Sequence, residues 1–557
     1  MPAYLKRDNE KGVLFVVLGG MKGPEFSDAL ARVKSVPGRR YNPEEKRWEL
    51  PDDAATALRV MQMLEPVADN DVQQSVRAHT AEVAENLVTA LPTDAKLELP
   101  WAEKLRPYQR ASVDFMVQHP KTLLADEMGT GKTLQSLATV EEWKLRNKVE
   151  GKTHQLIVCP KSLRGTWQNE IEKWLGEQSV AVIDGRNPAA RLKQLAETED
   201  TGGFVIVNWE SAWRDPLHKE LAARDWTAVL ADEAHRAKNR KAKQTKGLWK
   251  FQAPLQLALT GTPIMNSPDE LWSILKWLRP EQYTGFWPFH YSYVDEYNTR
   301  YGTVMTGVKN ADQLRFELSD KMVRRTKKDV LKELPEKTRQ VIPVELDPKQ
   351  KKLYREVEEA LFLDIAEFVE THDDLDADAL AGMPLSKLEG LVPNAGARIA
   401  KLRQVTSAAK AMAAEEIIRD NPGKPFVVFT WFVDTARNMA ETLEKGKPAQ
   451  KVGTIAGNDN PDPVKDAFQN GDLDHVIATI AKGGVGLTLT RADTAIFVDE
   501  DWVPAMNEQA EDRLHRIGQK RPVTILVLRC PGTVDDGKVA KANDFKRLVT
   551  AAVLGER

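Results

Sequence analysis

Residues 121–133 read KTLLADEMGTGKT, an apolar run that leads through a glycine-containing loop into a segment with helical spacing. The first five residues have the length and composition of a short buried strand, and the apolar positions of 132–143 recur as on one face of a helix. A strand, a glycine turn and a helix N-terminus in this order are typical of a parallel α/β fold. The stretch therefore predicts the fold class.

The chemistry of the loop suits phosphate. Small residues allow backbone N–H groups to close around phosphate oxygens, Lys132 can reach the β- and γ-phosphates, and Thr133 offers a hydroxyl group to Mg²⁺. The helix N-terminus directs its dipole at the same anion. The usual leading glycine is Asp126 here, so from these residues alone a plain glycine turn between core elements stays open as the alternative.

A pair of acids follows about a hundred residues later. Residues 226–231 read WTAVLA, as expected for a strand buried on both faces, and Asp232 and Glu233 come directly after it. Carboxyl ends of parallel strands are where open α/β sheets bind ligands. Asp232 would hold Mg²⁺, and Glu233 would orient or deprotonate the attacking water. Taken singly, two solvated acids that begin a loop are the alternative.

Phosphoryl transfer also needs positive charge near its transition state. Residues 509–519, QAEDRLHRIGQ, carry Arg513 and Arg516. On a helix, residues three apart are neighbours on one face, so both guanidinium groups can point into a single cleft. The alternative is an exposed, charged helix with Glu/Arg pairs.

Several motifs occur together in one order along the chain. They are LRPYQ at 105–109, DEMGTGKT at 126–133, DEAHRAKN at 232–239, LTGTPIMN at 259–266, RRTKKDVLKELPEK at 324–337, KGGVGLTLT at 482–490 and QAEDRLHRIGQ at 509–519. Over roughly residues 100 to 540 this set resembles the Swi/Snf-type branch of the superfamily-two, DEAH-box-like ATPases. Asp126 in place of glycine is itself typical of that branch. The resemblance implies two RecA-like lobes and an ATP-hydrolysing enzyme that moves on DNA.

The resemblance also implies the residues of the ATP site. Lys132, Asp232, Glu233, Arg513 and Arg516 would be catalytic, and Thr133 and Asp232 would hold Mg²⁺ together with ATP. Gln109 resembles the family's adenine-reading glutamine, since a side-chain amide offers both a donor and an acceptor to a base edge; a surface glutamine is the alternative. The full set expected to bind ATP is Arg106, Gln109, Asp126, Glu127, Met128, Gly129, Thr130, Gly131, Lys132, Thr133, Gly486 and Gln509.

A further set occupies the positions at which the family contacts the sugar-phosphate backbone of DNA. It comprises Lys161, Ser162, Trp167, Lys238, Asn239, Thr262, Asn266, Trp431, Lys482, Gly483 and Trp502. Short polar side chains and backbone N–H groups at strand ends suit phosphate contacts that do not read sequence. Taken singly, each of these residues is about as well explained by a capping or turn role. Val503 stands where the family usually has asparagine, which puts hydrogen bonding beside Trp502 in doubt.

The first 75 residues predict a small α+β domain. Their PGRRYNP and KRWELP segments resemble the HARP domain that is attached to annealing helicases. Exposed cations with aromatic rings would give a patch that contacts phosphate and stacks on bases. That patch would comprise Arg39, Arg40, Tyr41, Lys46, Arg47 and Trp48. The alternative is a domain whose aromatic residues are core and whose basic residues are solvated.

The 557 residues suffice for two α/β domains and smaller pieces. The expected layout is a HARP-like domain at 1–75, a linker at 76–100, the first lobe at 101–275, a mostly helical insertion at 276–400, the second lobe at 401–540 and a tail at 541–557. The acidic stretch 373–378 is most simply a solvated loop. The net charge of −3 neither indicates nor excludes nucleic-acid binding.

Two cysteines far apart, Cys159 and Cys530, support neither a disulfide framework nor a zinc site. No signal-peptide core and no stretch of about 18 apolar residues is found. We therefore expect a cytoplasmic protein, or a nuclear one in a eukaryote, with no membrane partner.

The motifs favour a DNA-stimulated ATPase that translocates on duplex or branched DNA, without sequence specificity, and remodels it. A strand-separating DNA or RNA helicase and an ATP-switched subunit of a defence or recombination complex stay open as alternatives.

Overall fold

The computed structural model describes residues 3–19, 23–76 with short gaps, 93–299, 302–370, 394–457, 459–483 and 487–536, together with a few isolated positions. The chain divides into two compact units. One includes Gly131–Thr326 and the other includes Lys327–Leu548. The segments 77–92, 371–391 and 537–545 lie outside the described residues, so the predicted acidic loop and most of the predicted linker and tail are not covered.

The first unit is built on a seven-stranded sheet whose strands are all parallel. In spatial order these are β14 (Met322–Val323), β6 (Lys121–Leu124), β11 (Leu255–Leu259), β10 (Ala228–Asp232), β7 (His154–Cys159), β9 (Gly203–Asn208) and β8 (Val180–Ile183). The central strands are buried on both faces, which is why they read as continuous apolar runs rather than as alternating ones.

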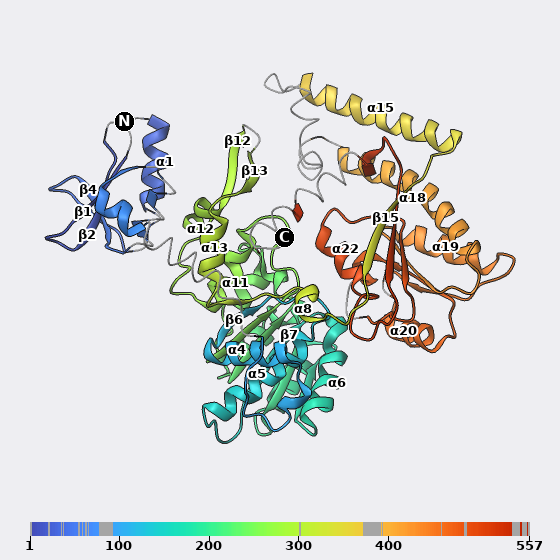
Figure 1. The fold of residues 1–557 in the computed structure, drawn as a ribbon, viewed down its shortest axis with the longest axis horizontal. Helices are drawn as coiled ribbons and strands as arrows, with labels where there is room; N and C mark the ends of the chain where they lie inside the picture. The colour runs from blue at the N-terminus through green and yellow to red at the C-terminus, as the bar shows by residue number, and fades with distance from the viewer. Residues whose placement is uncertain are drawn as a thin grey trace. The chain divides into compact units, whose positions relative to one another are not determined.

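Helices cover both faces of this sheet (Figure 1). In β7, Leu156 and Val158 join the core on one face, while Ile157 and Cys159 join the core on the other. The second of these cores includes side chains of α4 (Pro107–Gln118), α5 (Lys132–Arg146) and α6 (Arg164–Leu175). The first includes side chains of α7 (Pro188–Ala196), α8 (Trp209–Ala212), α9 (Leu217–Ala223), α10 (Lys243–Leu248), α11 (Glu270–Leu278), α12 (Phe286–Tyr293) and α13 (Ala311–Leu318). Short 3₁₀ helices occur at Ala102–Lys104, Lys161–Leu163 and Ala234–Ala237.

The second unit contains a six-stranded sheet, again entirely parallel. Its spatial order is β15 (Lys337–Pro343), β20 (Val523–Arg529), β19 (Thr494–Phe497), β16 (Phe426–Thr430), β18 (His475–Thr479) and β17 (Val452–Ile455). Its helices are α14 (Lys327–Val330), α15 (Pro348–Glu370), α18 (Ala395–Arg419), α19 (Val433–Glu444), α20 (Pro461–Asn470), α21 (Ile480–Gly483) and α22 (Pro504–Glu511). Val427 and Phe429 of β16 pack in one core with Phe468 of α20 and Ala510 of α22. Two parallel sheets with covering helices confirm the predicted fold class of two RecA-like lobes.

The boundaries between the lobes differ from the predicted ones. Strand β14 pairs with β6, so the first unit continues to Thr326 rather than ending at 275. Strand β15 pairs with β20 along its whole length, so the second sheet already begins at Lys337 rather than after 400. Neither strand has an apolar signal, because β14 has only two residues and β15 is an exposed strand at the edge of its sheet.

The predicted insertion is helical but not only helical. Between α12 and α13 the chain forms an antiparallel hairpin from β12 (Val294–Thr299) and β13 (Gly302–Val308). His290, on α12, is held between two carboxylates, with Nδ1 3.0 Å from Asp269 Oδ2 and Nε2 3.0 Å from Glu296 Oε1. This imidazole therefore connects the base of the hairpin to the start of α11.

The N-terminal residues form a separate small sheet. Its order is β3 (Arg40–Asn42), β4 (Arg47–Pro51), β2 (Val13–Val17), β1 (Tyr4–Asp8) and β5 (Val67–Ala68), with α1 (Gly23–Lys34) alongside. Leu5, Leu14, Val16 and Leu50 of the sheet share a core with Val33 of α1. The segment is thus an α+β domain, as its sequence pattern predicts.

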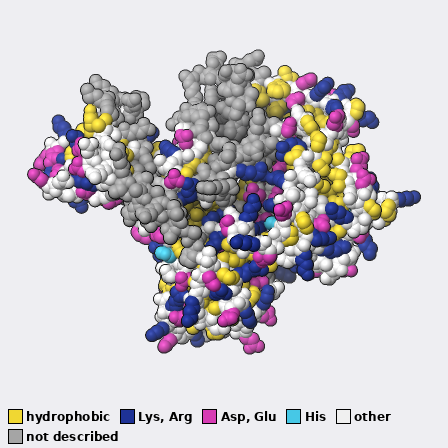
Figure 2. Space-filling view, viewed as in Figure 1, with side chains coloured by type: hydrophobic (Ala, Val, Ile, Leu, Met, Phe, Trp, Pro, Cys, Tyr) yellow, Lys and Arg dark blue, Asp and Glu magenta, His cyan; other side chains and the backbone are white. Residues whose placement is uncertain are grey.

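Charged side chains are mixed over the surface. On the face drawn in Figure 2, Lys and Arg lie interspersed with Asp and Glu within each unit rather than gathering into one basic patch. This agrees with the small net charge of −3. In the part of the chain that the structure describes, no helix is both long and apolar enough to cross a membrane.

Candidate active site

The glycine loop between β6 and α5 requires glycine at two positions. Gly129 and Gly131 have φ angles of 79° and 81°, which side chains rarely allow. Gly131 is also the residue that caps the N-terminus of α5. A methyl group added there would lie 2.7 Å from Nε2 of Gln109. The loop thus has the strand, turn and helix N-terminus that its sequence predicts.

Lys132 lies across this loop. Its Nζ donates hydrogen bonds to the backbone oxygens of Asp126, at 2.9 Å, and of Glu127, at 3.3 Å. Burial lowers the pKa of Lys132, and the nearby carboxylates of Glu233, Asp126 and Asp232 oppose this effect. An anion that approaches the helix N-terminus therefore finds the ammonium group already held at the loop.

Two arginines that sequence reasoning did not assign contact the residue that precedes the loop and the start of α4. Arg324 Nη1 donates to the backbone oxygen of Ala125 at 2.6 Å, and Arg325 Nη1 donates to that of Tyr108 at 3.0 Å. Asp126 is fully buried, and burial raises its pKa against the attraction of Arg325. The RRTKKDV motif was the available signal, and its first three residues belong to the first unit because they directly follow β14, which pairs with β6.

Asp232 and Glu233 lie at the carboxyl end of β10. Asp232 Oδ1 accepts the backbone N–H of Glu233 at 2.9 Å. Burial, and next the Glu233 carboxylate, raise the pKa of Asp232 to about 6. Glu233 has a left-handed φ of 51°, a strained backbone conformation of the kind that clusters at functional sites. His235 Nδ1 lies 3.2 Å from Glu233 Oε2 and 3.0 Å from Thr260 Oγ1, so the imidazole joins the acid pair to the end of β11.

This donor set fits Mg²⁺. The Asp232 carboxylate and the Thr133 hydroxyl are oxygen ligands of the kind that Mg²⁺ prefers, and a cation would offset both the burial and the repulsion by Glu233 that raise the pKa of Asp232. Among the described residues no group of three or more His, Cys, Asp or Glu could hold a metal ion alone. A magnesium ion at this site would therefore also need oxygens from a nucleotide.

Trp167 does not lie where its sequence position suggested. Its side chain is 1% exposed, and its Nε1 donates a hydrogen bond to Asp232 Oδ2 at 2.9 Å. The predicted DNA contact at Trp167 is therefore wrong for this structure, because the ring belongs to the core under the acid pair. Trp209 makes a related contact, since its Nε1 donates to the backbone oxygen of Asp232 at 2.8 Å. Both contacts depend on the packing of helices against the sheet, which local sequence does not reveal.

We expect Trp167→Phe to lower ATP turnover by roughly tenfold, with the larger loss at limiting Mg²⁺, because losing a hydrogen bond behind a metal ligand commonly costs this much. Trp174→Phe on the same helix is the matched control, since Trp174 Nε1 donates to Glu170 Oε2 at 2.8 Å away from the acid pair. Steady-state ATP turnover across a Mg²⁺ titration measures both variants. Equal losses in the two variants would contradict the assignment.

The candidate adenine-reading residue lies at the start of α4. Gln109 is buried, and its Oε1 accepts the backbone N–H of Arg106 at 3.0 Å. Its Nε2 faces Gly131, where an added methyl group would meet it. The structure thus brings Gln109 next to the phosphate loop, although the two belong to separate sequence motifs.

The predicted DNA contacts of the first sheet follow three neighbouring strands at their carboxyl ends. Lys161 and Ser162 come after β7, Lys238 and Asn239 after β10, and Thr262 and Asn266 after β11. Lys161, Ser162 and Asn239 are exposed, whereas Thr262 is buried. Lys238 Nζ and Asn266 Nδ2 both contact Glu270 Oε1, at 3.0 Å and 2.8 Å. Five of these six side chains are thus at least partly exposed at one sheet edge, and Thr262 could offer only its backbone.

Arg513 and Arg516, the two arginines expected to place positive charge near the transition state, do not share a helix face, because α22 already ends at Glu511. They converge nevertheless. Arg513 Nη1 donates to the backbone oxygen of Leu487 at 3.5 Å, and Arg516 Nη1 donates to the same oxygen at 3.0 Å. Gln509 is buried beside them, its backbone oxygen accepting Arg513 Nε at 3.1 Å. Gly486 lies outside the described residues.

The second sheet repeats the arrangement of the first. Trp431 follows β16, Lys482 and Gly483 follow β18, and Trp502 follows β19, and these strands are neighbours. Lys482 is exposed and Trp431 is partly so. Gly483 is buried, and a methyl group there would lie 2.7 Å from Cε1 of Phe429. Close packing therefore explains this glycine without a DNA contact.

The basic and aromatic residues of the small N-terminal sheet divide into two groups. Arg39, Arg40, Tyr41 and Lys46 are exposed. Arg47 is buried, and its Nη2 lies 2.5 Å from Asp8 Oδ2 and 3.3 Å from Glu49 Oε1. Trp48 packs against the domain core. A phosphate contact at Arg47 is therefore wrong for this structure, because the guanidinium group is already neutralised by carboxylates.

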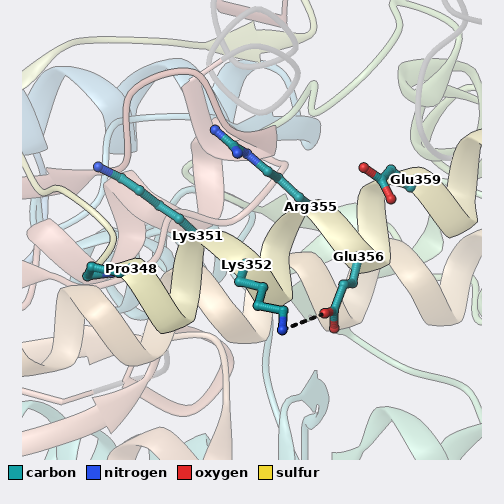
Figure 3. A pocket seen from close by; sticks show the side chains of 6 residues that line it. All are labelled: Pro348, Lys351, Lys352, Arg355, Glu356 and Glu359. Atoms are coloured by element: carbon teal, nitrogen blue, oxygen red, sulfur yellow. Dashed lines mark ion pairs between the residues drawn. The ribbon is translucent and has the colours of Figure 1, made fainter.

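A shallow pocket of about 440 Å³ lies elsewhere, along the outer face of α15 (Figure 3). It is lined by Pro348, Lys351, Lys352, Arg355, Glu356 and Glu359. Lys352 and Glu356 form an ion pair across one helical turn. The pocket contains none of the predicted ATP-site residues.

Comparison with known proteins identifies the class of protein. A model of the SNF2-related domain matches residues 108–386, and a model of the helicase conserved C-terminal domain matches residues 409–518. The chain belongs to the SNF2-related family. Residues 1–107 lie outside both matches, so the resemblance to a HARP domain stays a prediction.

Individual relatives match most of the length of this chain. The mouse protein "DNA annealing helicase and endonuclease ZRANB3" is 30% identical over 485 residues, which cover 82% of this chain and 41% of the relative. The zebrafish protein "Chromodomain-helicase-DNA-binding protein 1-like" is 27% identical over 463 residues, with coverages of 81% and 44%. The chain thus spans less than half the length of these relatives. The solved structure "Sulfolobus solfataricus SWI2/SNF2 ATPase core in complex with dsDNA" matches with 26% identity and a TM-score of 0.38, over 84% of this chain and 96% of that one.

Proposed function

We propose that this chain hydrolyses ATP in response to DNA and uses the hydrolysis to translocate on duplex or branched DNA and remodel it. The observation that carries the proposal is the shared location of two residue sets at the carboxyl edge of the first sheet. The acid pair ends β10, and the exposed Lys161 and Ser162 follow the adjacent strand β7. Membership of the SNF2-related family supports the same conclusion.

The proposed hydrolysis assigns one role to each residue of the site. Lys132 and the backbone of the glycine loop bind the phosphates, and Gln109 binds the adenine edge. Thr133 and Asp232 would hold Mg²⁺, which when bound neutralises charge on the phosphates. Glu233 orients the attacking water and accepts its proton. Arg513 and Arg516 supply positive charge to the transition state when the lobes close over ATP.

Contacts within the first unit suggest how hydrolysis is coupled to DNA. His235 lies between Glu233 and Thr260, and Thr260 Oγ1 accepts the backbone N–H of Thr262 at 3.1 Å. Thr262 and Asn266 belong to the loop that we propose to face DNA. A displacement of that loop on DNA binding would therefore move the hydrogen-bond partner of the imidazole beside the catalytic carboxylate.

ATP turnover by the full chain tests the proposal, measured without nucleic acid and with plain duplex, forked, gapped and single-stranded DNA and with RNA. We expect duplex or forked DNA to raise turnover at least severalfold. The absence of stimulation by any DNA contradicts the proposal, and a preference for RNA favours an RNA helicase.

A strand-displacement assay separates the two kinds of motor. A remodelling translocase should displace a triplex-forming strand and leave a plain duplex intact, whereas a strand-separating helicase should unwind the duplex.

A further inference from the structure

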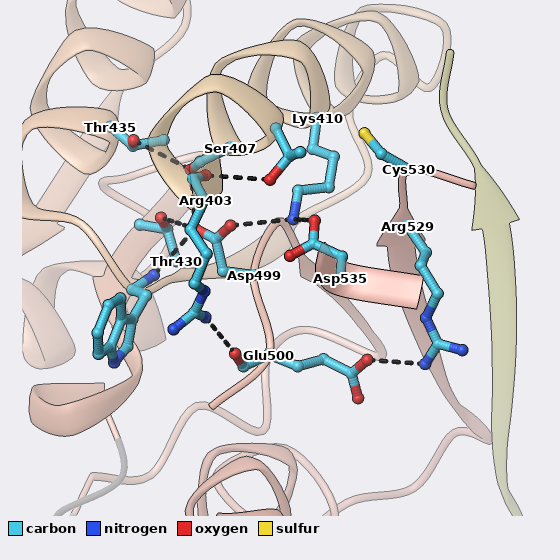
Figure 4. Close-up of polar contacts among 12 residues, drawn as sticks. Arg403, Ser407, Lys410, Thr430, Thr435, Asp499, Glu500, Arg529, Cys530 and Asp535 are labelled. Carbon is cyan, nitrogen blue, oxygen red and sulfur yellow. Dashed lines mark hydrogen bonds and ion pairs between the residues drawn. The ribbon is translucent and has the colours of Figure 1, made fainter. Parts of the chain in front are cut away.

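Three polar residues of α18 occupy one buried face of the helix. Arg403, Ser407 and Lys410 are spaced by four and three residues, which places them on the same side. Arg403 and Lys410 are each only 1% exposed. Cations are almost never buried to this extent unless they are paired. Figure 4 shows these side chains directed from the helix toward Asp499, Glu500 and Asp535.

Lys410 and Asp499 form the centre of this cluster. Lys410 Nζ lies 3.1 Å from Asp499 Oδ1 and 2.5 Å from Asp535 Oδ2. The other oxygen of Asp499 accepts hydrogen bonds from Ser407 Oγ at 2.8 Å, from Thr430 Oγ1 at 2.6 Å and from the backbone N–H of Trp431 at 3.1 Å. Asp499 therefore fixes the backbone where β16 ends and Trp431 begins.

Arg403 fixes the side chain of the same tryptophan. Its guanidinium carbon lies 4.0 Å from the ring centroid of Trp431 and 5.0 Å from that of Trp502. Its Nη2 donates to the backbone oxygen of Glu500 at 2.7 Å. The Glu500 carboxylate is held in turn by Arg339 and Arg529, at 2.5 Å and 2.8 Å. The guanidinium group thus has its plane and position fixed behind two indole rings.

The exposures distinguish what can reach DNA from what cannot. Trp431 is 38% exposed and Trp502 is partly exposed, whereas Arg403 is covered by them. A guanidinium group near proposed DNA contacts is ordinarily a phosphate ligand, but this one has no exposed surface with which to bind phosphate. Both rings come from loops that follow strands β16 and β19, and Arg403 is a buried group that contacts the two rings together, whereas Phe432 lies edge-on to Trp431 with ring centroids 5.4 Å apart.

We propose that Arg403 is a positioning residue that holds Trp431 and Trp502 in the orientation that contacts DNA, without touching DNA itself. This inference rests on the proposed DNA-stimulated activity. Rings that are already ordered before binding lose less conformational entropy when they bind, so DNA affinity increases. A planar guanidinium group can stack on both rings and donate to Glu500, whereas a lysine ammonium group cannot reproduce that geometry.

The test compares Arg403→Lys with Arg398→Lys, five residues earlier on the same helix. Arg398 pairs with Asp364 on α15 and contacts neither tryptophan, which makes it a matched control. For Arg403→Lys we expect the DNA concentration that gives half-maximal stimulation of ATP turnover to rise about five- to tenfold, from the loss of cation–π contacts. The maximal stimulated rate should change less than about twofold. Arg398→Lys should leave both quantities at the wild-type values.

A second comparison separates positioning from general stability. In a Trp431→Ala background, Arg403→Lys should cause a smaller rise in the half-maximal DNA concentration, and in a Trp431→Ala/Trp502→Ala background no further rise, since the residue acts through those two rings. Melting temperatures are measured in parallel, and Arg403→Gln, which keeps a planar amide, is included so that the test rests on whichever variant keeps the wild-type melting temperature.

Three outcomes are decisive. A wild-type half-maximal concentration in a folded Arg403 variant overturns the inference, as does an Arg403 effect that persists in full in the Trp431→Ala/Trp502→Ala background. If the wild-type chain itself shows no stimulation by DNA, the proposed function fails, and this inference fails with it.

Discussion

Glu233→Gln is expected to lower ATP turnover by about two to three orders of magnitude while nucleotide binding is retained. Glutamine keeps the shape of the side chain and leaves the strained backbone at this position unchanged, but its amide cannot accept a proton from water. DNA remodelling should be lost together with hydrolysis. Turnover assays and equilibrium binding of a fluorescent ATP analogue measure the two effects separately.

Glu210→Gln is the matched control for this change. Glu210 is a solvent-facing carboxylate on α8 whose Oε1 pairs with Arg236 at 3.0 Å, and its substitution should leave turnover unchanged. Turnover of Glu233→Gln within tenfold of wild type would contradict the catalytic assignment. If DNA were still remodelled by a variant that binds but does not hydrolyse ATP, the chain would be a nucleotide-controlled switch instead.

Lys410→Met is expected to lower the free energy of unfolding of the second unit by about 3–5 kcal/mol. The variant leaves the carboxylates of Asp499 and Asp535 buried without the ammonium group that neutralises both. Lys401→Met on the exposed side of α18 is the control and should change stability by less than about 0.5 kcal/mol. Urea-induced unfolding followed by circular dichroism gives the comparison, and equal stability of the two variants would contradict it.

The stability difference should also depend on pH. Burial acts to raise the pKa of Asp499, but the attraction of Lys410 and the hydrogen bond from Thr430 outweigh it, and the pKa is lowered. A carboxyl group whose pKa is lowered by folding stabilises the fold above its unfolded pKa and loses this contribution as the pH falls through its folded pKa. The difference in the free energy of unfolding between wild type and Lys410→Met should therefore become smaller as the pH is lowered below about 4.

Sequence predicts the central strands of both sheets well and their edges poorly. Strands such as β10 and β11 are buried on both faces, and this burial requires the uninterrupted apolar runs that a reader of the sequence can find. The residues of β15 are almost all exposed, so only the pairing with β20 makes them a strand. The lobe boundaries were misplaced for the same reason, because β14 and β15 mark them.

The candidate site divides along a similar line. Motifs predicted Lys132, Asp232 and Glu233, because each is set by a strand end or a loop next to it in sequence. The role of Trp167 depends on a contact with a residue 65 positions away, and that of Arg403 on two rings from separate loops. A cation on a helix is ordinarily solvated, so nothing in the local pattern around Arg403 distinguishes it from its exposed neighbours.

The contact between Gly131 and Gln109 bears on attempts to redesign nucleotide preference. The amide that we propose to read the base lies beside the N-cap residue of the phosphate-binding helix, and a methyl group added at Gly131 would lie 2.7 Å from its nitrogen, so the amide would have to shift. A replacement at Gln109 chosen to accept guanine would therefore alter the grip on the triphosphate as well. We therefore expect base selectivity and triphosphate affinity to be coupled in this chain, and a library that alters one of the two positions should vary the other with it.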